Sequence, residues 1–141
     1  GELAKLFPDP QIHIGFDEVT LDDWNTTSIS KWMASMGMRH LRDVETFFLN
    51  RTSALAGKYG KEVIIWDDPV GEGVVVPTQV ALQVWNSGKE LVQQLSDAGY
   101  KVAYSTPFYL DNLANTWRVI YANPELEQAP SNVIGGEACM W

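Results

Sequence analysis

The stretch Ile12-His13-Ile14-Gly15-Phe16-Asp17-Glu18-Val19 joins a short apolar run to two neighbouring carboxylates. The apolar residues predict a strand over residues 12–15, and the acids follow where that strand ends. Neighbouring acids in different environments are the groups that sugar-cleaving chemistry uses. The stretch therefore predicts both a buried strand and a candidate catalytic pair at its carboxyl end.

The alternation of strand and helix patterns continues along the chain. Apolar residues recur at helical spacing in residues 41–58, and the β-branched run Val63-Ile64-Ile65-Trp66 follows. The other predicted strands are 80–85, 102–105 and 133–134, and the other predicted helices are 28–36, 87–98, with a capping box formed by Ser87 and Glu90, and 112–122. This order predicts an α/β fold with a parallel sheet. Residues 67–79 are rich in Pro and Gly and leave no room for an ordinary crossover helix.

Each predicted strand leads to acidic or aromatic side chains. They are Asp17 and Glu18, then Trp66, Trp85, Tyr109 with Asp111, and finally Glu137 and Trp141. In a barrel of parallel strands all carboxyl ends meet on one face, where active sites lie. Aromatic rings stack on the apolar faces of a sugar and carboxylates accept its hydroxyl hydrogens, so this set suits a carbohydrate.

Composition argues against several other partners. The formal net charge is −8 and the 10 Lys and Arg residues do not cluster, which disfavours nucleic acid and anionic membrane surfaces. No apolar run reaches the length of a membrane span. Cys139 is the single cysteine, so neither an intrachain disulfide nor a cysteine-based zinc site is expected.

Taken together, these residues resemble glycoside hydrolase family 20, the β-N-acetylhexosaminidases. The resemblance is carried in order by His13-Ile14-Gly15-Phe16-Asp17-Glu18, Trp66, Val84-Trp85, Tyr109-Leu110-Asp111, Trp117-Arg118 with Tyr121 and Pro124, and Gly135-Gly136-Glu137-Ala138-Cys139-Met140-Trp141. It implies a (β/α)8 TIM barrel of which residues 1–141 supply only the C-terminal part, about strands 4 to 8. The family's sugar-binding arginine and a trailing acid then lie outside this chain.

The resemblance also assigns roles. It implies a retaining exo-hydrolase in which the substrate's own 2-acetamido oxygen attacks the anomeric carbon, with Glu18 as acid and base. Asp17 orients the acetamido group and Tyr109 donates to its oxygen. Substrate-binding residues are Trp66, Trp85 and Trp141, which surround the ring, and Asp111, which accepts from a hydroxyl. No cofactor and no metal are implied.

Supporting residues have competing interpretations. His13 is either a metal ligand with Asp17 or a buried strand histidine that supports the carboxylates through a hydrogen bond. Glu137 either binds substrate or is a buried, paired structural carboxylate. Trp117 is expected to pack in the core, Cys139 to pack as a small hydrophobe, and Asp67-Asp68 to form a turn.

Two other functions compete with the hydrolase. The family usually has a second glycine where this chain has Phe16. That departure motivates a relative that binds N-acetyl sugars but is impaired in catalysis. His13, Asp17 and Glu18 together motivate a metal-dependent hydrolase on a similar barrel.

The expected partner is an oligosaccharide or glycoconjugate substrate, and family members are often dimers, which allows a homodimer. A lysosomal or secreted location follows from the resemblance and from the sequons at Asn25 and Asn50. Residues 1–141 alone are expected to be inactive and to associate, because part of a barrel leaves open sheet edges.

Overall fold

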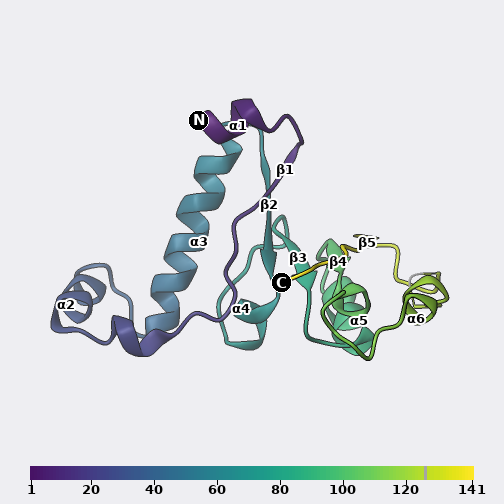
Figure 1. The fold of residues 1–141 in the computed structure, drawn as a ribbon. Helices are drawn as coiled ribbons and strands as arrows, with labels where there is room; N and C mark the ends of the chain where they lie inside the picture. The colour runs from purple at the N-terminus through teal and green to yellow at the C-terminus, as the bar shows by residue number, and fades with distance from the viewer. Residues whose placement is uncertain (126) are drawn as a thin grey trace.

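The fold is organised by a sheet of five parallel strands, in the order β1-β2-β3-β4-β5. The structure is a computed structural model that describes residues 1–125 and 127–141. The strands are β1 (Gln11–His13), β2 (Glu62–Trp66), β3 (Ala81–Val84), β4 (Val102–Tyr104) and β5 (Val133–Gly135). Figure 1 shows them side by side, with the C-terminus near the middle of the molecule.

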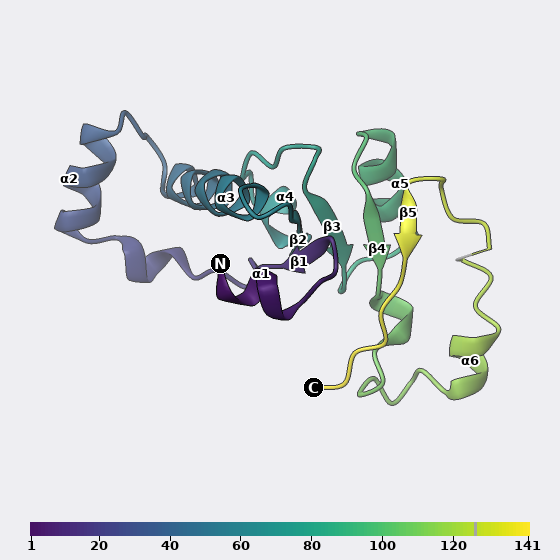
Figure 2. The same ribbon diagram turned by 90° about the horizontal axis from the view of Figure 1, so that it is seen from above.

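One helix precedes the first strand, and the other helices and turns occupy the connections between the strands. They are α1 (Glu2–Leu6), the 3-10 turn η1 (Leu21–Trp24), α2 (Thr27–Ser35), α3 (Leu41–Gly57), α4 (Asp68–Gly71), α5 (Lys89–Asp97), the 3-10 turn η2 (Thr106–Phe108) and α6 (Trp117–Tyr121). Seen from above, α2 and α3 lie toward the β1–β2 end of the row of strands, and α5 and α6 lie toward the β4–β5 end (Figure 2).

The strand order identifies the way the chain winds. Each strand pairs in parallel with the next one along the chain, so that Ile12 lies opposite Val63 and Leu82 opposite Val102. A doubly wound sheet instead reverses direction and places its first strand in the middle. Strictly sequential order is the winding of a (β/α) barrel. The fold is therefore α/β with a parallel sheet, consistent with part of a TIM barrel.

The hydrophobic core lies between the sheet and its helices. Leu49 of α3 and Ile65 of β2 are fully buried, as are Leu82 and Val102, and Leu95 of α5 joins the same cluster. Alternate strand residues face the opposite side. That side carries polar groups, including Gln83, whose amide donates to Ser105 Oγ at 2.8 Å.

Several predicted elements are confirmed, and most of their bounds differ from the predicted ones by one or two residues. The helix predicted over 41–58 is α3, and the segment 67–79 contains only the one-turn helix α4. The helix predicted over 112–122 is reduced to α6, which begins after Thr116, whose side chain accepts from the Val119 N–H. The capping box predicted at Ser87 is wrong: α5 begins at Lys89 after Gly88, with no side-chain cap.

The predicted burial of Trp117 is also wrong. Its side chain is 69% exposed, because α6 lies at the periphery and the sheet does not cover it. The Arg118 guanidinium lies 5.1 Å from the centre of the Trp117 ring, in a cation–π contact. Cys139, in contrast, is buried as predicted.

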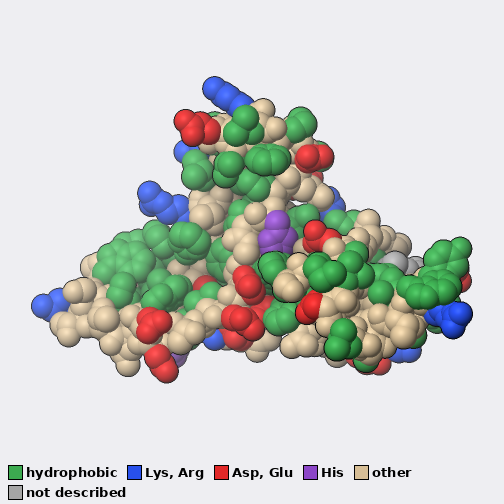
Figure 3. Space-filling view, in the orientation of Figure 1, with side chains coloured by type: hydrophobic (Ala, Val, Ile, Leu, Met, Phe, Trp, Pro, Cys, Tyr) green, Lys and Arg blue, Asp and Glu red, His purple; other side chains and the backbone are tan. Residues whose placement is uncertain are grey.

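Apolar side chains are also exposed along the helices. Met36, Phe48 and Leu55 are each about half exposed, and Figure 3 shows a broad hydrophobic area over α2 and α3. Within the described residues, no helix is both long enough and apolar enough to cross a membrane.

Candidate active site

The carboxyl ends of the strands surround one cavity of about 360 Å³. The residues that line it are those predicted from the sequence to bind and cleave a sugar: Asp17, Glu18, Trp66, Trp85, Tyr109, Asp111 and Trp141. They come from the loop after β1, the end of β2, the position after β3, the segment after β4 and the segment after β5. The geometry thus brings together the set that the sequence singled out, while the role of each residue stays a prediction.

The acidic pair is presented by an unusual backbone. Gly15, Phe16 and Glu18 all have positive φ angles, of 81°, 82° and 50°. The turn is tied to neighbouring segments, since the Gly15 N–H donates to His13 Nδ1 at 3.1 Å and the Gly15 carbonyl accepts from the Trp66 N–H at 3.0 Å. A non-glycine residue in the left-handed region costs about 1–2 kcal/mol, so this loop stores conformational strain next to the acids.

Phe16 departs from the family pattern without entering the cavity. Its side chain is 9% exposed and its ring centre lies 5.7 Å from that of Phe48 on α3. Phe16 is part of the hydrophobic core and does not line the cavity. The benzyl group that the sequence places beside the acids therefore packs against the helix layer.

Aromatic rings form one side of the cavity. The ring centres of Trp66 and Trp85 lie 6.3 Å apart at 70°, and those of Trp85 and Tyr109 lie 6.2 Å apart at 36°. Trp66 also contacts His13, with ring centres 4.8 Å apart. Rings held in such edge and tilted contacts keep their positions and offer flat apolar surfaces to a ligand.

Tyr109 is suited to donate a hydrogen bond. Burial raises the pKa of its phenol to about 12, so the O–H stays protonated at physiological pH. The backbone beside it is fixed, because the Leu110 N–H donates to the Cys139 carbonyl at 2.8 Å and Tyr109 pairs with Cys139 in a parallel bridge. This bridge also brings the end of the chain, with Trp141, to the cavity.

His13 differs from its prediction. It is exposed, so the expectation of a buried strand histidine is wrong. Its Nδ1 accepts from the Gly15 N–H, and among the described residues no hydrogen bond joins the imidazole to a carboxylate. Desolvation of the ring lowers its pKa, while the charges of Glu137 and Asp17 act in the opposite direction.

Glu137 is paired as predicted but is not buried. One carboxylate oxygen accepts from the Gln83 amide at 2.6 Å, and the Glu137 N–H donates to Ser105 Oγ at 3.2 Å. The side chain is exposed, and Glu137 and His13 both line a second cavity of about 340 Å³.

Asp67 and Asp68, which the sequence predicts only as a turn, lie beside the site. Asp67 is buried and accepts from the Trp85 backbone N–H at 3.2 Å, and burial raises the pKa of Asp67 to about 6. Asp68 accepts from the Trp85 indole N–H at 2.7 Å and from the Glu18 backbone N–H at 3.3 Å. Their position directly after Trp66 was the available signal, but Asp-Asp-Pro also matches a turn.

The described part of the chain offers no set of side chains arranged to bind a metal ion. Across residues 1–125 and 127–141, no group of three or more His, Cys, Asp or Glu side chains is arranged to hold an ion.

The fold and cavity define a class of protein that the comparisons identify. The family model "Glycosyl hydrolase family 20, catalytic domain" matches residues 1–141, and the chain belongs to that family. It is therefore a segment of a glycoside hydrolase catalytic domain.

The chain is similar to several known proteins. The chain is 32% identical over 154 residues to beta-hexosaminidase subunit A1 of Dictyostelium discoideum, covering 99% of this chain and 29% of the relative. It is 30% identical over 151 residues to the beta-hexosaminidase subunit beta of Rattus norvegicus, covering 99% and 28%. The fold is shared with the family 20 exo-β-N-acetylglucosaminidase of Vibrio harveyi in complex with N-acetylglucosamine, with a TM-score of 0.85, 23% identity, and coverage of 99% of this chain and 25% of that one. The chain thus spans under a third of the curated relatives it matches.

Proposed function

We propose that the protein containing this chain is a retaining exo-β-N-acetylhexosaminidase that removes terminal β-linked N-acetylglucosamine or N-acetylgalactosamine. Residues 1–141 would form part of a single catalytic barrel domain and supply about strands 4 to 8. The observation that carries the proposal is the single cavity formed by residues from all five strand ends. Its volume of about 360 Å³ lies at the small end of ligand sites, about 300–1,000 Å³, and suits one sugar unit.

The adjacency of Asp17 and Glu18 favours a substrate-assisted mechanism. Two carboxylates that act directly on opposite sides of an anomeric carbon lie about 5 Å apart across the sugar. Consecutive residues of one loop do not straddle a ring in that way. A substrate that supplies its own acetamido oxygen as the nucleophile removes the need for a second carboxylate across the ring.

In this mechanism Glu18 donates a proton to the leaving oxygen as the acetamido oxygen closes on the anomeric carbon. Asp17 accepts from the acetamido N–H and stabilises the positive charge that develops. Tyr109 donates to the acetamido oxygen, which its protonated phenol permits. Glu18 then takes a proton from the water that opens the cyclic intermediate, and the configuration is retained.

The remaining cavity residues bind the sugar. Trp66, Trp85 and Trp141 line the cavity and would enclose the ring, excluding water from the reacting bond. Asp111, exposed at the cavity mouth, would accept from a hydroxyl at the C4 or C6 end.

Replacement of the acid tests the proposal. In the full-length protein, Glu18→Gln should lower turnover of an aryl β-N-acetylglucosaminide by about 10²–10⁴-fold and leave inhibitor binding nearly unchanged. The matched control is Glu90→Gln, an exposed glutamate on α5. Unchanged turnover by Glu18→Gln would remove Glu18 as the acid.

The second candidate is an N-acetyl-sugar-binding relative impaired in catalysis, which the strained Phe16 backbone favours. It requires calorimetric binding of N-acetylglucosamine without turnover by the unaltered protein. Ordinary turnover would dismiss it.

Assembly and location are further parts of the proposal. A homodimer is supported by relatives that are described as subunits. A lysosomal or secreted location is supported by sequons whose asparagines, Asn25 and Asn50, are both exposed. Residues 1–141 alone should be inactive and should associate through exposed residues such as Phe48 and Leu55, which sedimentation and an aryl-glycoside assay would test.

A further inference from the structure

Asp68 contacts two different parts of the cavity lining with its two carboxylate oxygens. Oδ1 accepts from the backbone N–H of Glu18 at 3.3 Å, and Oδ2 accepts from the indole N–H of Trp85 at 2.7 Å. Glu18 belongs to the loop after β1 and Trp85 follows β3, whereas Asp68 follows β2. The carboxylate of the middle strand therefore joins the ends of the strands on either side of it.

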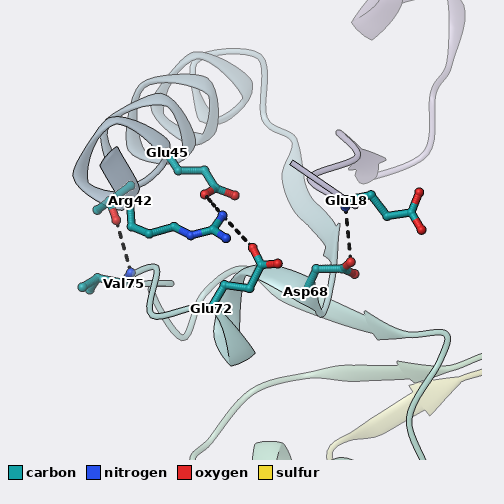
Figure 4. A network of polar contacts seen from close by, with 7 residues as sticks. Glu18, Arg42, Glu45, Asp68, Glu72 and Val75 are labelled. Atoms are coloured by element: carbon teal, nitrogen blue, oxygen red, sulfur yellow. Dashed lines mark hydrogen bonds and ion pairs between the residues drawn. The ribbon is translucent and has the colours of Figure 1, made fainter. Parts of the chain in front are cut away.

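The contact with Glu18 acts on a backbone that needs support. Glu18 has φ of 50°, a conformation that costs an L-residue about 1–2 kcal/mol and persists only where surrounding contacts hold it. Figure 4 shows the Glu18 N–H directed at Asp68, while the Glu18 side chain extends away from this contact. The hydrogen bond thus fixes the backbone and leaves the carboxyl group free to act in the cavity.

Trp85 is held at two points by consecutive aspartates. Asp67 accepts from its backbone N–H at 3.2 Å, and Asp68 accepts from its indole N–H. A tryptophan restrained at both its backbone and its ring edge keeps one orientation, which a ring that stacks on a sugar requires.

Asp68 is itself placed by a fixed frame. It is the first residue of α4, and Glu72 follows the last residue of that turn. Arg42 of α3 bonds both Glu72 and the buried Glu45 at 2.6 Å, and the Val75 N–H donates to Thr46 Oγ1 at 3.2 Å (Figure 4). These contacts tie α4 and its following loop to the long helix α3, so Asp68 is anchored to the scaffold.

We propose that Asp68 is a positioning residue that couples the proton-donating Glu18 to the sugar-stacking Trp85. The inference rests on the proposed function and adds a residue that acts through its two neighbours without touching substrate. Loss of Asp68 misplaces the acid, and the effect is largest for substrates whose departure depends most on protonation.

The test compares leaving groups in the full-length protein. A phenyl β-N-acetylglucosaminide needs protonation of its leaving oxygen, whereas the dinitrophenyl glycoside departs with little help. Asp68→Ala should lower kcat/KM, which reports the steps up to departure of the leaving group, by about 10–100-fold for the phenyl substrate and by less than about fivefold for the dinitrophenyl substrate. Asp68→Asn, which keeps one carbonyl acceptor, should lie between Asp68→Ala and the unaltered protein. The control, Asp97→Ala on α5, removes an exposed carboxylate that accepts from the Gln93 amide and should change neither rate.

The outcomes distinguish the role of Asp68 from the proposed function. An equal loss of kcat/KM on both substrates gives Asp68 a merely structural role and overturns the inference, as does an unchanged kcat/KM. Failure of the unaltered protein to cleave either substrate instead overturns the proposed function. If Asp68→Ala does not fold, a double-mutant cycle of Asp68→Asn and Trp85→Phe replaces that variant in the test, because the phenylalanine ring lacks the N–H donor. Additive losses in that cycle would contradict the coupling through Trp85.

Discussion

Phe16 provides a test of the backbone that presents the acids. Its φ of 82° strains a non-glycine residue, while its ring is 9% exposed and packs against Phe48. Phe16→Ala deletes the ring and keeps the strain, so it should destabilise the protein by about 3–5 kcal/mol. Phe16→Gly deletes the same ring but releases the strain, so it should be more stable than Phe16→Ala by about 1 kcal/mol.

The matched control is Phe48, the partner ring, which lies inside α3. There glycine is the poorer helix residue, so Phe48→Gly should be less stable than Phe48→Ala by about 1 kcal/mol. Urea unfolding followed by tryptophan fluorescence measures all four variants. If glycine is worse than alanine at both positions, the left-handed backbone at Phe16 is refuted. Because the ring does not line the cavity, Phe16→Gly should also keep its KM for an aryl N-acetylglucosaminide.

The remaining predictions concern the frame around the cavity. Arg42→Ala leaves Glu45, which is 1% exposed, without its charge partner and should lower the urea-unfolding stability by about 3–5 kcal/mol, whereas no loss would mean that the pair is dispensable. Gly136→Ala places a Cβ 2.5 Å from the Tyr104 carbonyl oxygen and should lower both Tm and turnover, while Gly57→Ala meets nothing within 4 Å and should lower neither. The stability that protonated Asp67 supplies is fully present below a pH of about 3.8 and is lost as the pH rises through about 6. Tm should therefore fall over this pH window by the equivalent of about 1–2 kcal/mol of unfolding free energy. Asp67→Asn should remove that dependence, and an identical pH profile would show that Asp67 titrates normally.

Much of the architecture was readable from local patterns. Apolar runs such as the one that contains Val63 and Ile65 indicate buried strands, and amphipathic helices alternate with them along the chain. When such strands pair in parallel, their carboxyl ends lie on the same face. The convergence of Trp66, Trp85 and Tyr109 on one cavity follows from this rule without any knowledge of side-chain geometry.

The features that could not be predicted from the sequence depend on tertiary contacts. The role of Asp68 needs the relative placement of three loops, and no spacing within residues 67–69 encodes it. The exposure of His13 and Glu137 depends on which segments pack beside them in the fold, which local spacing does not encode. Trp117 looks like a core residue on its own helix, but α6 lies at the edge of the molecule.

In the proposed mechanism, the cavity positions the acetamido group of the substrate as the nucleophile. The direct measurement compares kcat/KM for an aryl β-N-acetylglucosaminide with kcat/KM for its N-trifluoroacetyl analogue, in the full-length protein. Fluorine withdraws electrons from the acetamido oxygen, so kcat/KM should fall sharply for the analogue. Equal rates for the two substrates, or equal turnover of an aryl glucoside that lacks the acetamido group, would contradict it.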